Sequence, residues 1–121
     1  MVLVDTSVWV AHLRLGNSGL ACLLNHGGVL LHPFIIGEIA LGNLARRDAI
    51  LAYLSDQPNA AVATPREVLR LIEQNGLAGS GIGYIDAHLL AAARLSPGTA
   101  IWTYDKRLHA AAARLRMAYR A

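Results

Sequence analysis

The fold is decided near the N-terminus by the stretch VLVDTSVW, residues 2–9. Three consecutive aliphatic residues favour a short buried strand, and Asp, Thr and Ser are the residues preferred just before a helix. We therefore expect a strand over residues 2–4 that leads directly into a helix ending at Gly16. A fully apolar strand followed at once by a helix is typical of a parallel sheet covered on both faces.

The remaining chain continues this alternation of strands and helices. Further strands are expected over residues 29–31, 60–63 and 100–103, and a short closing strand over residues 117–119. Helices are expected after Asn17, from Pro33, over residues 46–56, after the capping box at residues 64–67, over residues 84–95, and after Asp105. These signals predict the α/β class, with a central parallel sheet of four or five strands between two layers of helices.

Composition agrees with one compact domain over residues 1–121, since 55% of the residues are hydrophobic and the mean hydropathy is +0.38. The sequence contains no apolar run of about 18 residues, the length that a membrane helix needs. The N-terminus lacks the basic region of a signal peptide, so we expect a cytoplasmic protein. The single cysteine, Cys22, excludes an internal disulfide and is expected to be a small buried hydrophobe. Trp9, Trp102 and Phe34 are expected in the core, because apolar residues flank them.

Basic residues outnumber acidic ones, eleven to eight, which gives a net charge of +3. The sequence pI is about 9.5. A mildly basic surface permits binding to a polyanion without proving it. Arg46, Arg47 and Arg107 are candidates for phosphate contacts, and solvated helix faces are the simpler interpretation.

The eight acidic residues fall into two groups. Asp48, Asp56, Glu67 and Glu73 stand among polar neighbours, as on a solvated helix face. The other four interrupt apolar segments, where an isolated charge is costly. They are Asp5, Glu38, Asp86 and Asp105.

The four acids of the second group are expected to converge. Asp5 and Asp105 follow strands, and the carboxyl ends of parallel strands form the ligand-binding edge of an open α/β sheet. Glu38 and Asp86 would reach this edge from helices. Helix capping could instead explain the three aspartates, and pairing with an arginine could explain Glu38.

Four carboxylates in one pocket would repel one another strongly unless a cation lay among them. Ligation by oxygen alone, without cysteine or a well-spaced histidine pair, suits Mg²⁺ or Mn²⁺ rather than zinc. The sequence therefore predicts a site for a divalent metal ion.

The acids lie in the segments DTS (residues 5–7), HPFIIGEIALG (32–42), YIDAHLL (84–90) and WTYDKRL (102–108). In order and placement, these segments resemble the four acidic motifs of PIN domains, with the greatest likeness to VapC toxins, over the full length of the chain. The resemblance implies a PIN-like fold and metal-binding, catalytic roles for the four acids. It also implies that Thr6 or Ser7, and Thr103, hydrogen-bond to the site. Some relatives carry another acid or amide after the fourth motif, whereas Lys106 and Arg107 follow here, so the number of metal ions stays open.

The same resemblance implies a function. A VapC toxin is a divalent-metal-dependent endoribonuclease, in which a water activated by carboxylate-held Mg²⁺ or Mn²⁺ hydrolyses RNA phosphodiester bonds. Products with 5′-phosphate and 3′-hydroxyl ends would result. The implied partners are RNA, a VapB-type antitoxin and a second copy of the chain, with no membrane.

Other interpretations are weaker. RNA cleavage by histidines is possible in principle, but the five histidines share no spacing, and His32 is expected to pack near a helix start. A HAD-type phosphotransferase needs a second aspartate two residues after Asp5, where Ser7 stands, and a receiver domain needs an acidic pair near its first strand. A PIN-like module that only binds RNA or protein would be expected to lack one or more of the four acids.

Overall fold

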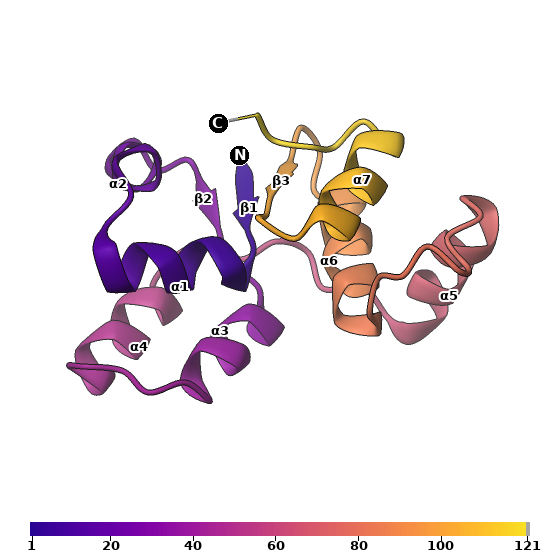
Figure 1. Cartoon of the computed structure of the whole chain (residues 1–121). Helices are drawn as coiled ribbons and strands as arrows, with labels where there is room; N and C mark the ends of the chain where they lie inside the picture. Colours follow the sequence, from indigo (N-terminus) through magenta and orange to yellow (C-terminus); the bar gives the residue numbers. More distant parts are fainter. Residues whose placement is uncertain (121) are drawn as a thin grey trace.

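The computed structural model describes residues 1–120, which fold around a three-stranded parallel sheet (Figure 1). The strands are β1 (Val2–Val4), β2 (Val29–Leu30) and β3 (Ala100–Trp102), arranged in the order β2-β1-β3. Strand β1 pairs with both neighbours, so that Leu3 lies opposite Leu30 on one side and Ile101 on the other. All residues of β1 are buried, as expected of a central strand with helices on both faces.

Within residues 1–120, seven helices accompany the strands. They are α1 (Thr6–Leu15), α2 (Ser18–Asn25), α3 (Pro33–Ala40), α4 (Arg47–Ser55), α5 (Pro65–Gln74), α6 (Tyr84–Leu95) and α7 (Lys106–Arg114). Helices α1, α3 and α4 gather on one side of the sheet and α5, α6 and α7 on the other (Figure 1). This arrangement confirms the predicted α/β/α layers. In the described part of the chain, every helix is too short or too polar to cross a membrane.

The prediction of four or five strands was wrong, because the outer two segments pair at one residue each. Asn59 forms a single parallel bridge with Leu31. Beyond it, the Ala61 N–H donates to the Ser96 Oγ at 2.9 Å instead of to β2. Pro58 has no N–H to extend the pairing in the other direction. Residues 60–63 are therefore an extended connection and not a strand.

The C-terminal segment behaves in the same way on the opposite edge. Ala118 forms a single bridge with Ile101, framed by bonds from Ile101 N–H to the Met117 carbonyl at 2.6 Å and from Tyr119 N–H to the Ile101 carbonyl at 2.8 Å. Of the five predicted segments, three form ladders, and the outer two lie along β2 and β3 with a single bridge each.

Most helix starts agree with the capping residues of the sequence. The Thr64 Oγ accepts the Glu67 N–H at 3.2 Å, and the Glu67 carboxylate accepts the Thr64 N–H at 2.9 Å, which confirms the capping box. Asn17 caps α2 through the Leu20 N–H at 3.0 Å. Each such cap stabilises its helix by about 1 kcal/mol.

The buried apolar side chains of the sheet and helices form one core cluster, which includes Trp9 and Trp102 as predicted. Two other expectations were wrong. Phe34 is 37% exposed, because it stands in the first turn of α3 and packs against His88 with one edge only. Cys22 is exposed, because the short helix α2 buries only the face that carries Leu20.

His32 precedes α3 and lies fully inside the protein. Its Nδ1 accepts the Phe34 N–H at 3.0 Å, so the imidazole acts as the helix cap. Its Nε2 is buried and has no hydrogen-bond partner within residues 1–120. Burial lowers the pKa of His32 below its usual value, and the nearby His88 lowers it further. The folded protein therefore disfavours a charged His32.

We expect the free energy of unfolding to fall as the pH drops below about 6.5. The unfolded chain binds a proton at His32 near that pH, whereas the folded protein, with its lowered pKa, does so only at lower pH. The stabilisation is thus complete above the unfolded-state pKa and is lost as the pH falls toward the folded-state pKa. Thermal melts between pH 8 and pH 5 would measure this slope. The variant His32→Asn keeps a capping acceptor and should flatten the slope, whatever its absolute Tm; an unchanged slope would contradict the assignment.

Candidate active site

The carboxylate of Asp5 lies at the point where β1 ends and α1 begins, and the residue is only 7% exposed. Two hydroxyls donate to its Oδ2, from Thr103 at 2.7 Å and from Ser7 at 2.9 Å. The side chain makes no capping hydrogen bond to α1. Helix capping therefore does not explain Asp5, whose side chain is instead held by the end of β3.

The two hydroxyls also accept hydrogen bonds from the chain beyond β3. The Tyr104 N–H donates to the Ser7 Oγ at 3.0 Å, and the Asp105 N–H donates to the Thr103 Oγ at 3.0 Å. Each hydroxyl thus donates to Asp5 and accepts from a backbone amide, which fixes its orientation. This network joins the carboxyl ends of β1 and β3, and it carries Asp105 to the same edge of the sheet as Asp5.

Glu38 lies on the exposed side of α3, which corrects the expectation of an apolar environment. Helix α3 is apolar in sequence nearly all round, but it buries only Ile35 and Ile39 and leaves its outer face open. The Thr6 Oγ donates to the Glu38 Oε1 at 2.7 Å. Thr6 opens α1, so this contact brings Glu38 beside the residue that follows Asp5. The hydrogen bond comes from a threonine and not from an arginine.

Asp86 is half-buried in the first turn of α6, where its Oδ2 accepts the Gly83 N–H over a long 3.4 Å. Its pKa is raised, chiefly by burial. The Gly83 hydrogen bond opposes the rise, and the charges of Asp5, Asp105 and Glu38 add to it. Coulombic repulsion of this kind falls off with distance, so each of these three charges lies near enough to Asp86 to act on it.

Asp105 is exposed and caps α7, since its Oδ1 accepts the Leu108 N–H at 2.8 Å. The capping interpretation of the sequence is therefore correct for this residue. It is also compatible with a second role, because a carboxylate has a further oxygen and spare lone pairs.

The donor chemistry of the four acids fits a divalent cation. Carboxylate oxygens are the ligands that Mg²⁺ and Mn²⁺ prefer, and a cation would relieve the repulsion that raises the pKa of Asp86. As oriented here, however, no three His, Cys, Asp or Glu side chains of residues 1–120 lie close enough together to hold one ion. Each acid is instead directed toward its own hydrogen-bond partner. The acids fit a divalent cation by their chemistry, and side-chain rotation would be needed to bring their oxygens onto one ion.

The three candidate arginines occupy different environments. Arg47 donates to the carbonyls of Ala40 and Gly42, so its guanidinium serves the C-terminus of α3. Arg46 has a left-handed backbone with φ of 53° and precedes α4. Arg107 lies exposed in the first turn of α7. Phosphate contacts by these residues remain predictions, and Arg47 has the fewest free donors for one.

One contact near the site was missed in the sequence. A Cβ added to Gly81 would lie 2.9 Å from the Arg107 Cδ, so the arginine side chain rests directly on this glycine. The only sequence signal for it is the glycine-rich segment of residues 77–83, which by itself indicates a loop and names no partner.

The two buried histidines, His32 and His88, give no support to a histidine-based reaction. His32 and His88 flank the Phe34 ring at centroid distances of 4.9 Å, and both are buried. Burial lowers the pKa of both, and it keeps their rings from a polymeric substrate.

Comparison with known proteins agrees with this geometry. The PIN domain family is matched over residues 2–114, a range that includes all four acids and their hydroxyl partners. The chain is also 45% identical over 113 residues to "Ribonuclease VapC32" of Mycobacterium tuberculosis, strains CDC 1551 / Oshkosh and ATCC 25618 / H37Rv. The alignment covers 93% of this chain and 91% of each relative.

Replacing Thr103 tests whether Asp5 depends on its hydroxyl donors. Thr103→Val keeps the side-chain shape but leaves a buried carboxylate with one donor fewer, which should lower the free energy of unfolding by about 1–3 kcal/mol. Thr103→Ser keeps the donor and should cost less. Urea unfolding of the three proteins measures both effects. A valine variant as stable as the parent would show that the network contributes little.

Proposed function

The chain belongs to the PIN domain family, and we propose that it is an endoribonuclease that hydrolyses RNA phosphodiester bonds with a divalent metal ion. The observation that supports the proposal is the hydrogen-bond network that joins Asp5 and the start of the Asp105 turn at one edge of the sheet, with the charges of Asp5, Asp105 and Glu38 acting on Asp86. Its second support is the alignment of 93% of the chain, at 45% identity, with proteins named ribonuclease. The proposal treats residues 1–121 as a single PIN-like domain acting in the cytoplasm.

In this proposal the four acids share one role, and nearby hydroxyls orient two of them. Asp5, Glu38, Asp86 and Asp105 would hold Mg²⁺ or Mn²⁺. When bound, the ion supplies the positive charge that eases deprotonation of water and stabilises the charge developing on the phosphate. Ser7 and Thr103 keep the buried Asp5 carboxylate in one orientation through bonds of 2.9 and 2.7 Å. Thr6 does the same for Glu38 at 2.7 Å.

The raised pKa of Asp86 is part of the same argument. Burial and the other three carboxylates disfavour its charged form, so Asp86 gains most from a nearby cation. The ionisation of Asp86, which is disfavoured in the metal-free protein, is therefore expected to become favourable when the ion is bound. This linkage makes the site selective for positive charge.

We propose that the protein is the toxin half of a toxin–antitoxin pair, held inactive by a VapB-type antitoxin. The support is the name of the relatives, together with a groove of about 590 Å³ beside Glu38. Apolar side chains of α1, α3 and α4 line this groove with Arg14 and Arg46. An antitoxin segment with apolar and acidic side chains would fit it and would cover Glu38.

A homodimer is part of the proposal as well. Exposed apolar side chains support it, among them Leu15 at the end of α1 and Leu41 just after α3, which are 91% and 90% exposed. Phe34 and Tyr84, which both pack against His88, are also accessible. A second copy would remove this apolar surface from water.

Chelation tests the metal dependence. EDTA should abolish RNA cleavage, and Mg²⁺ or Mn²⁺ should restore it. Without a cation, the negative carboxylates would repel the negative substrate phosphate. The same ions should raise the Tm of the protein, since they bind the folded state. Product ends should be 5′-phosphate and 3′-hydroxyl. Full cleavage in EDTA with 2′,3′-cyclic phosphate ends would overturn the proposal.

Amide substitutions test the four acids against the remaining acids. Asp5→Asn, Glu38→Gln, Asp86→Asn and Asp105→Asn should each slow cleavage by about 100-fold or more, since the loss of outer-shell partners alone costs roughly 10–100-fold. Each should also relieve growth arrest when the protein is expressed alone. The double variant Asp5→Asn with Asp86→Asn should resemble either single variant, because the ligands act as a unit.

The controls for this series are Asp48→Asn and Asp56→Asn, which lie on or at the end of α4 and are exposed. They should leave cleavage and toxicity unchanged. Thermal melts verify that every variant is folded, and metal-free Asp86→Asn should be as stable as the parent or more so, because its charge is unfavourable. If Asp86→Asn is folded and fully active, Asp86 is only a helix cap. An inactive parent chain that binds RNA would indicate a non-catalytic PIN-like module instead.

A further inference from the structure

Arg107, in the first turn of α7, lies against Gly81 in the loop that precedes α6. A Cβ added to Gly81 would stand 2.9 Å from the Arg107 Cδ and 3.1 Å from both its Nε and its Nη1. These three atoms share the plane of the guanidinium group and are almost equally near, so the flat face of the side chain covers the glycine. A side chain at residue 81 would therefore displace the arginine.

This contact ties Arg107 to the segments of two acids. Arg107 stands two residues after Asp105. Gly81 stands two residues before Gly83, whose N–H donates to the Asp86 Oδ2 at 3.4 Å. The arginine thus reaches from the turn that follows Asp105 to the turn that precedes Asp86. It lies at the margin of the sheet edge that carries the acids.

The guanidinium group of Arg107 is not engaged by these two acids. The Asp105 Oδ1 accepts the Leu108 N–H at 2.8 Å, and the Asp86 Oδ2 accepts the Gly83 N–H. Within residues 1–120, no hydrogen bond or ion pair holds the Arg107 side chain, and the residue is exposed to solvent. The glycine covers one face of the group, whereas its N–H bonds lie in the plane and point outward. They are therefore free to donate to an acceptor.

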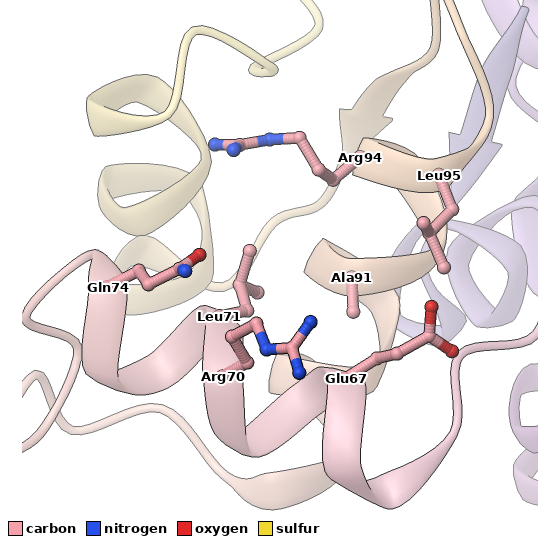
Figure 2. Close-up of a pocket in the computed structure, with 7 residues that line it drawn as sticks. All are labelled: Glu67, Arg70, Leu71, Gln74, Ala91, Arg94 and Leu95. Carbon is pink, nitrogen blue, oxygen red and sulfur yellow. The ribbon is translucent and has the colours of Figure 1, made fainter.

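Other arginines already have partners in the protein. The Arg47 guanidinium donates to carbonyls at the end of α3. Arg70 and Glu67 stand on the same face of α5, beside a hollow of about 180 Å³ between α5 and α6 (Figure 2). Hydrogen bonds with Thr64 lower the pKa of Glu67, and the charge of Arg70 lowers it further. Arg70 is thus an exposed arginine with an acid beside it, which makes it a control for Arg107.

We propose that Arg107 binds a phosphate of the RNA strand next to the one that is cleaved, and that Gly81 positions the arginine for this contact. The inference rests on the proposed ribonuclease function and adds to it a group that holds the strand. The planar fork of a guanidinium group matches two oxygens of one phosphate. Because Arg107 lies at the margin of the acids, the scissile phosphate would meet the metal ion and a flanking phosphate would meet the arginine.

The glycine favours this contact in a second way. An exposed arginine side chain loses conformational freedom when it binds a ligand. The flat surface at Gly81 already restricts Cδ, Nε and Nη1, so less freedom is lost on binding. The contact also places a positive charge where the strand passes the carboxylates, which would otherwise repel it.

Gly79 provides a matched control for Gly81. The two glycines lie in the same loop with left-handed backbones, at φ of +77° and +86° respectively. Alanine at either position incurs the same kind of backbone strain. A Cβ at Gly79 would meet no atom within 4 Å, whereas a Cβ at Gly81 would displace Arg107. Gly79→Ala and Gly81→Ala should therefore have similar Tm values and differ in RNA binding.

Fluorescence anisotropy tests the contact, with the full chain in EDTA and a labelled single-stranded RNA oligomer. Arg107→Ala and Gly81→Ala should each weaken binding about five- to tenfold, because a hydrogen bond to a charged group is lost. Each should also reduce the slope of log K against log salt concentration by about 0.7, the value for one phosphate of a single strand. Gly79→Ala and Arg70→Gln should bind RNA as the parent does.

Two further variants separate the contact from a general effect on the loop. Gly81→Ala combined with Arg107→Ala should bind no more weakly than Arg107→Ala alone, since the glycine acts through the arginine. Arg107→Lys should recover part of the affinity lost in Arg107→Ala, because it restores the charge without the fork. Parent affinity in Arg107→Ala, or equal losses in Gly79→Ala and Gly81→Ala, would overturn the inference.

Cleavage in the presence of metal distinguishes a flanking phosphate from the scissile one. Arg107→Ala should raise the KM for an RNA oligomer and leave kcat unchanged. For a dinucleotide, whose only phosphate is the scissile one, the same variant should change neither constant. An equal effect on both substrates would contradict the flanking position.

The inference and the proposed function fail separately in these experiments. A parent chain that binds RNA without cleaving it would overturn the ribonuclease function, while the anisotropy series would still decide the role of Arg107. A chain that cleaves RNA and binds it equally well after Arg107→Ala would keep the function and remove that role.

Discussion

The buried carboxylate of Asp5 and the two hydroxyls that hydrogen-bond to it connect the end of β1 with α1 and with the end of β3. A carboxylate that is 7% exposed is costly unless donors surround it, and Ser7 and Thr103 supply them at 2.9 and 2.7 Å. Because Thr103 follows β3, its hydrogen bond to Asp5 requires the C-terminal ends of β1 and β3 to lie side by side. The sheet register, with Val4 opposite Trp102, and the position of Asp105 both follow from this requirement.

The other acids show a balance between local hydrogen bonds and mutual repulsion. Glu38 is held by Thr6, Asp86 by Gly83, and Asp105 by the first turn of α7. These contacts direct each carboxylate to a separate partner. Burial raises the pKa of Asp86, and the charges of the other three carboxylates raise it further. A cation would exchange weak local contacts for strong electrostatic ones, which is how the proposed activity would depend on metal.

The two ends of the sheet have opposite chemistry. Acids gather beyond the C-terminal ends of β1 and β3, and arginines stand near the N-terminal end of β3. A parallel sheet places the ends of all its strands together, so residues that follow strands collect at one edge and residues that precede them collect at the other. An RNA bound at the acidic edge would meet negative charge from the protein, and basic groups elsewhere would offset that repulsion.

The sequence by itself determined the features that depend on residues a few positions apart. The capping box at Thr64, the Asn17 cap, the helix start at Pro33 and the strand–helix junction at Asp5 all use contacts within about one helical turn. The same reasoning singled out the four acids, since a charge that interrupts an apolar segment is visible without knowledge of the fold. Only the tertiary structure decided which groups meet. Asp5 and Thr103 are 98 residues apart, and the sequence alone does not state that their atoms touch. Exposure was decided in the same way: Glu38, Phe34 and Cys22 have apolar neighbours in sequence but are exposed in the folded protein. Burial and the choice of hydrogen-bond partner depend on packing between segments that are distant in the sequence. Local sequence patterns do not specify that packing.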